Sequence, residues 1–89
     1  MPANQTSLYL VYLRDGAPLE PAEFAGLRKL DEGLYLLRTA QTRSKVYHSI
    51  KRAAGPEGLL VAPLADRPKF KGMEEGALKW MRSPDIGSA

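Results

Sequence analysis

The sequence predicts an α+β protein in which helices pack on an antiparallel sheet. Short runs of strand-forming residues alternate with segments whose apolar residues recur at helical spacing. Their order is strand, helix, hairpin, helix, strand and a last short helix, which is typical of a ferredoxin-like sandwich with two helices on one face of the sheet. At 89 residues, we expect one domain over residues 7–83, preceded by a flexible arm (1–6) and followed by a disordered tail (84–89).

The first strand is predicted at Ser7–Arg14, with the sequence SLYLVYLR. Both of its faces are apolar, because Leu8, Leu10 and Tyr12 alternate with Tyr9, Val11 and Leu13. A strand with two apolar faces is typically central in its sheet and covered on both sides. Asp15-Gly16 then provides a turn.

The segment after this turn permits two interpretations. Pro21 suits the first position of a helix, with Glu23 in the first turn and with Phe24, Leu27 and, if the helix extends that far, Leu30 on the inner face. Alternatively, residues 28–30 already belong to a strand and residues 31–33 form a hairpin turn into Leu34. The boundary within 27–33 stays open, and we favour a short helix, a brief strand and then the hairpin.

Residues 33–56 carry the strongest local signals. Residues 34–40 read as a strand, and Thr42 can cap the helix that follows by accepting a bond from a first-turn N–H. Val46 and Ile50 form the buried stripe of that helix. Gly55-Pro56 ends it, since glycine adopts the left-handed conformation readily and proline cannot continue a helix.

The remaining elements are a strand at 58–64, a polar, basic connection at 65–72 and a helix at 73–82. Pro63 cannot donate to a ladder, so it belongs at the end or on the edge of its sheet. The last helix contains Gly76, which weakens it, and we expect its stability to come from docking of Trp80. The residues on its inner side are Met73, Ala77, Trp80 and Met81.

Composition excludes several classes of protein. Hydrophobic residues make up 44% and charged residues 26% of the chain, which is ordinary for a globular domain. With no cysteine, disulfides, thiolate nucleophiles and zinc-knuckle chemistry are excluded. The sequence shows neither a signal peptide nor an apolar run of membrane-spanning length, so we expect a cytoplasmic protein without a membrane partner.

Charge is unevenly distributed along the chain. The net charge is +3, yet residues 33–56 hold no acid and five bases, which are Arg38, Arg43, Lys45, Lys51 and Arg52. A second basic cluster follows at Arg67, Lys69 and Lys71. Such clusters track phosphate backbones, although a solvated helix face whose last cations complement the helix dipole has the same pattern.

The candidate nucleic-acid-binding residues lie on the basic helix. Arg43, Tyr47 and Lys51 follow i, i+4, i+8 spacing, which places them on one side of it. Lys45 and Arg52 lie beside them. Tyr47 has the best claim among the four tyrosines to ligand contact, because aromatic rings stack on bases and the strand tyrosines are expected to pack in the core.

No pattern predicts a catalytic residue, a metal or a cofactor. His48 is one turn from Ser44, but no acid lies within seven residues to orient it, so a surface or phosphate-contacting role is favoured. Glu74 and Glu75 read as residues that complement a helix dipole, because one histidine and scattered carboxylates offer no metal-ligand spacing.

From Leu8 to Leu64 the pattern resembles the small CRISPR-associated nuclease-like family and its SinR-like relatives. In that family a first strand with a tyrosine-containing end is followed, after a helix, by a strand resembling 34–39, a second helix and a strand resembling 58–62. Members with nuclease activity carry an aspartate directly after the first-strand tyrosine, whereas here Tyr12 is followed by Leu13. The resemblance implies a ferredoxin-like dimer that binds nucleic acid, and it does not imply catalysis.

Two functions follow from these patterns as expectations. The first is a non-enzymatic homodimer that binds DNA, RNA or another polyanion through the basic helix. Dimerisation is expected because a short chain has too few helices to cover both faces of an apolar sheet. The alternative is a metal-dependent nuclease or other small hydrolase of the same fold, with a site near Asp15.

Overall fold

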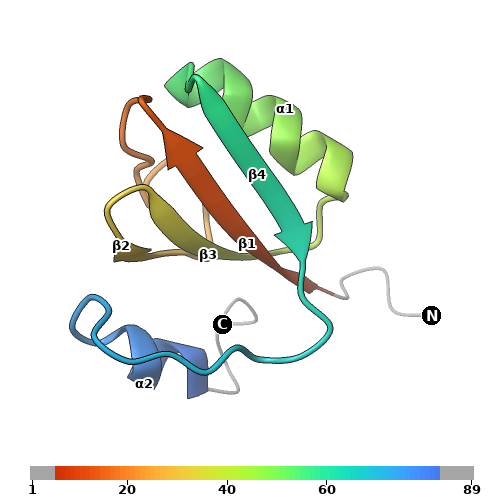
Figure 1. The fold of residues 1–89 in the computed structure, drawn as a ribbon. Helices are drawn as coiled ribbons and strands as arrows, with labels where there is room; N and C mark the ends of the chain where they lie inside the picture. Colours follow the sequence, from red (N-terminus) through yellow and green to blue (C-terminus); the bar gives the residue numbers. More distant parts are fainter. Residues whose placement is uncertain (1–5, 83–89) are drawn as a thin grey trace.

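The computed structural model describes residues 6–82, which form a single antiparallel sheet with helical segments on its two sides (Figure 1). The strand order is β2-β3-β1-β4, and every neighbouring pair is antiparallel. The predicted α+β class is therefore confirmed. The elements are β1 (Ser7–Arg14), β2 (Leu27–Asp31), β3 (Leu34–Thr39), α1 (Arg43–Ala54), β4 (Gly58–Pro63) and α2 (Ala77–Arg82).

Strand β1 is central, as its two apolar faces predict, because it pairs with β3 on one side and with β4 on the other. The face with Tyr9, Val11 and Leu13 is buried under α1. Tyr9 also donates its hydroxyl to the carbonyl of Gln41, 2.9 Å away, which ties the strand to the start of the helix.

Helix α1 begins and ends where its capping residues predict. The Thr42 hydroxyl accepts a hydrogen bond from the Lys45 amide at 3.2 Å, which satisfies one of the free first-turn donors. Gly55 adopts a left-handed conformation with φ 56°, and its amide donates to the Lys51 carbonyl. Both caps are properties of local sequence, which explains why the pattern located them.

The helix predicted from Pro21 is wrong. Residues 21–24 form a turn in which the amides of Glu23 and Phe24 both donate to the Glu20 carbonyl, and β2 begins at Leu27. A single turn of helix is costly to nucleate, and pairing with β3 satisfies the backbone of residues 27–31 instead. Leu27 and Leu30, three apart as on a helix, lie in different core clusters on opposite faces of the sheet.

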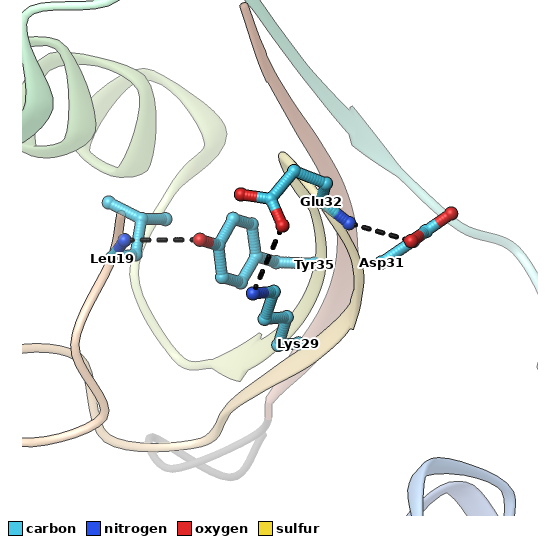
Figure 2. A network of polar contacts seen from close by, with 5 residues as sticks. All are labelled: Leu19, Lys29, Asp31, Glu32 and Tyr35. Atoms are coloured by element: carbon cyan, nitrogen blue, oxygen red, sulfur yellow. Dashed lines mark hydrogen bonds and ion pairs between the residues drawn. The ribbon is translucent and has the colours of Figure 1, made fainter. Parts of the chain in front are cut away.

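Residues 17–24 cover the part of the sheet where a second helix was expected. Leu19 is buried and its amide donates to the Tyr35 hydroxyl at 3.2 Å, as Figure 2 shows. Phe24 packs against the same cluster. The prediction of two helices on one face is therefore corrected: α1 and an irregular segment share that face.

The second interpretation of residues 27–33 is confirmed in its main feature, a hairpin between β2 and β3. Its register shifts between Lys29 and Asp31. An ion pair of 3.6 Å joins Lys29 and Glu32 at the turn (Figure 2). Gly33 has φ 73°, and its carbonyl accepts a bond of 2.7 Å from the Leu13 amide.

The opposite face of the sheet packs against the C-terminal segment, which lies on the other side from α1 (Figure 1). Helix α2 is shorter than predicted, because Gly76 has φ 86° and stands outside it. Two bonds of 2.8 Å hold the segment to β2, from Arg28 Nη2 to the Glu75 carbonyl and from the Glu74 amide to the Leu30 carbonyl. The buried residues of this second cluster are Leu30, Leu36, Ala77 and Met81.

The C-terminal segment leaves part of this face open. Tyr12 and Leu60, cross-strand partners on β1 and β4, are 41% and 51% exposed. The predicted tail and all of the predicted arm except Thr6 lie outside the described residues. Within residues 6–82, neither helix has the length and apolar character needed to cross a membrane.

Candidate polyanion-binding surface

Helix α1 positions the five predicted binding residues. Val46 and Ile50 anchor it to the sheet, at 1% and 0% exposure. All five predicted residues are exposed, and they are Arg43, Lys45, Tyr47, Lys51 and Arg52. We call these five residues together with His48 the basic face.

The basic face consists of two rows. Tyr47 and Ile50 are three residues apart, about 60° around the helix, so the row Arg43, Tyr47 and Lys51 runs beside the buried stripe. The exposure of Tyr47, only 37%, agrees with a position beside the buried stripe. A second row, Lys45, His48 and Arg52, lies on the side away from the sheet, with His48 about 160° around the helix from both Val46 and Ile50.

His48 joins the two rows. Its ring meets that of Tyr47 edge to face, with centroids 5.3 Å apart and an interplanar angle of 84°. Such a pair restrains both rings and presents one aromatic surface between the cations. Spacing placed His48 one turn from Ser44, but the two make no hydrogen bond in the described part of the chain, which gives no support to a Ser/His nucleophile.

The cations of α1 have no acidic partner in the described part of the chain. The only ion pair among residues 6–82 joins Lys29 and Glu32 at the hairpin. No acid occupies the first turn of α1, whereas Lys51 and Arg52 occupy its last turn, where they complement the helix dipole. That role accounts for two of the four cations, and Arg43 and Lys45 at the opposite end have no such explanation.

The structure divides the basic run of the sequence between two faces. Arg38 does not join α1, because its guanidinium carbon lies over the Trp80 ring on the α2 side, 5.8 Å from the ring centroid. Arg67 lines a hollow together with Arg38. One residue of the second basic cluster, Arg67, thus lies beside the same hollow as Arg38 of β3. Sequence spacing alone does not predict that these two arginines share a hollow.

A hollow of about 380 Å³ lies beside Asp15, at the C-terminal end of β1. Asp15 and Glu32 both line it, with Tyr12 and Arg14. Asp15 has φ 57°, a conformation that aspartate tolerates in turns. The described residues contain no group of three or more histidine, cysteine or acidic side chains placed to hold a metal ion.

Fold and surface together define a small α+β protein with one basic helix face that has no acidic partner in the described part of the chain. No protein-family model, curated protein or solved structure matches the chain. The resemblance to the CRISPR-associated nuclease-like family therefore stays a prediction from the pattern of strands and helices.

Proposed function

We propose that the protein is a non-enzymatic module that binds nucleic acid or another polyanion through the basic face of α1. The observation that carries this proposal is the exposure of four cations on a twelve-residue helix that has no acid. A surface of one sign attracts a polymer of the other sign and raises its local concentration. The aromatic pair Tyr47 and His48 adds a surface on which an unpaired base can stack.

The expected mode of binding is contact with phosphates. Lysine and arginine neutralise phosphates without reading sequence, so affinity is expected to differ little between sequences. If all four cations of the basic face each neutralise one phosphate, the logarithm of affinity for duplex DNA falls with the logarithm of salt with a slope of roughly −3.6.

Replacing Arg43 and Lys51 together with alanine is expected to weaken binding to all sequences alike. The slope against salt is expected to become shallower by roughly 1.8, because two phosphate contacts are lost. Fluorescence anisotropy with single- and double-stranded DNA and RNA, at a series of salt concentrations, measures both quantities.

The matched control is the double variant Lys69→Ala and Lys71→Ala, which removes the same charge from exposed positions of the 65–72 connection. If both variants weaken binding equally, attraction depends on net charge and the basic face is not the site. Absence of wild-type binding at low salt would leave α1 as a solvated helix surface.

We also infer that the fold is ferredoxin-like, with its first helix replaced by residues 15–26. Support comes from the sheet, where β3 lies between β1 and β2 and is antiparallel to both. Strands β1 and β2 are thus parallel and separated by one strand, the arrangement of a split βαβ unit. The connection between them carries Leu19 and Phe24 in place of the apolar stripe of a helix.

A second copy of the chain is the proposed partner of the open sheet face. Tyr12 and Leu60 expose apolar surface on neighbouring strands, and β4 is an edge strand whose sequence GLLVAP contains no charge. Edge strands in monomers are usually protected by charges, and here only Pro63 interrupts the row of donors. A two-fold axis near β4 would bring the same apolar surface of both copies together, and the dimer would carry two basic faces.

Leu60→Glu is expected to convert a homodimer to a monomer, because each copy would bury a carboxylate in the interface. The expected interface of the wild type covers about 1,200–2,000 Å² in total. Light scattering at micromolar concentration measures the mass, with Ala22→Glu, an exposed turn position, as control. A monomeric wild-type protein would disprove this part of the proposal.

A further inference from the structure

A hollow of about 220 Å³ lies at the end of the sheet where β1 begins and β4 ends. Ser7 pairs there with Thr39 of β3, and the Leu64 amide donates to the Leu8 carbonyl at 2.8 Å. The backbone of three segments therefore frames the hollow. Arg38 reaches it from β3 and Arg67 reaches it from the connection after β4.

Arg38 is held in place and retains unused hydrogen-bond capacity. Its guanidinium lies over the Trp80 ring, with 5.8 Å between the guanidinium carbon and the ring centroid. Its Nε is buried and has no hydrogen-bond partner among the described residues. The Nε has almost no accessible surface, so a ligand in the hollow would bond to the Nη atoms of Arg38, which carry the other donors of the guanidinium.

The charges around the hollow favour an anion. Arg38 and Arg67 bring two positive charges, and Asp66 is the only carboxylate of the lining. One oxygen of Asp66 accepts a bond of 2.7 Å from the Arg67 amide. No ion pair joins Asp66 to either guanidinium in the described part of the chain. Thr6 and Ser7 add hydroxyl donors.

We propose that this hollow binds a single phosphoryl group. Guanidinium is planar and presents several fixed donors, a geometry that matches phosphate oxygens and is stronger than a neutral hydrogen bond. A dianionic group neutralises both arginines, whereas a carboxylate neutralises one. The volume is below the range of about 300–1,000 Å³ typical of pockets for whole small molecules, which favours a small anion.

This site goes beyond the binding proposed for α1, because neither arginine belongs to the basic face. Its ligand is inorganic phosphate or the terminal phosphate of a nucleic-acid strand, which share the same chemistry. Trp80 is the only tryptophan of the chain and contacts Arg38, so its emission reports on the hollow directly.

The test titrates the full chain with inorganic phosphate and follows Trp80 emission, with sodium chloride at matched ionic strength as reference. We expect a saturable change that chloride does not reproduce. Arg67→Ala is expected to weaken phosphate affinity about tenfold or more. Arg38→Lys is expected to weaken it too, because an ammonium lacks the planar fork. Lys69→Ala, an exposed cation outside the hollow, is expected to bind like the wild type.

Three outcomes would overturn the proposal. They are the lack of a saturable response in the wild type, an equal response to chloride, and wild-type affinity in Arg67→Ala. Because Arg67 is exposed, its replacement is expected to leave the fold intact. The Arg43→Ala, Lys51→Ala double variant must keep its phosphate response; a loss there assigns the response to the basic face instead. Failure of this site thus leaves the function proposed for α1 untouched, and the converse also holds.

A second arm identifies the source of the phosphoryl group. Oligonucleotides with a 5′-phosphate and with a 5′-hydroxyl are compared for affinity. A preference for the phosphorylated strand that disappears in Arg67→Ala assigns the hollow to strand ends. Saturable inorganic phosphate binding without that preference assigns it to free phosphate.

Discussion

Met81→Ala is expected to lower the free energy of unfolding by about 2–5 kcal/mol. Met81 is 2% exposed and packs with Leu30 and Leu36 on the face of the sheet away from α1. Its truncation leaves a cavity beneath α2. A helix of six residues is not stable by itself, so α2 depends on this contact with the sheet. Chemical denaturation with circular dichroism measures the change.

Lys79→Ala is the matched control on the same helix, because Lys79 is exposed and alanine is a good helix former. We expect a change within about 0.5 kcal/mol. Trp80→Ala is expected to fall between the two, because Trp80 is only half-buried. A Met81→Ala variant as stable as the control would mean that α2 is a loose appendage and the sheet is stable without it.

Gly26→Ala has the second large expected effect. Gly26 has φ 84°, and a Cβ there would lie 2.2 Å from the Arg38 carbonyl oxygen. The left-handed conformation itself costs a residue with a side chain roughly 1–2 kcal/mol. The contact adds about 1–3 kcal/mol, because the backbone of β3 has to move. Loss of stability in thermal and chemical denaturation is the expected result.

Gly55→Ala separates these two contributions. Gly55 also has a positive φ, but nothing lies within 4 Å of a Cβ at that position. Its replacement is expected to show the conformational cost alone. Equal losses in the two variants would show that β3 yields to the added methyl group without cost.

Local signals located the elements that depend on neighbours in sequence. The alternation of Ser7–Arg14 placed the central strand, and Thr42 and Gly55 marked the two ends of α1. These predictions are correct because a helix cap bonds to a backbone group only a few residues away, and because the alternation of side chains is set within a single strand. The exposure of the basic face follows in the same way, since the apolar stripe of Val46 and Ile50 decides which side of the helix meets the sheet.

Only the tertiary structure decided what fills the space beside α1 and where Arg38 points. Residues 21–30 carry apolar residues at helical spacing, yet pairing with β3 made Leu27–Asp31 a strand and left the turn before it to cover the core. The turn signal at residues 31–33 allowed this hairpin as an alternative, but strand formation depends on packing against the partner strand, so local propensity did not decide between the two interpretations. The meeting of Arg38, Trp80 and Arg67 depends on three separate segments. Sequence alone therefore determined the basic helix α1. Tertiary packing decided that Arg38, which precedes this helix in the chain, lies on the α2 side of the sheet.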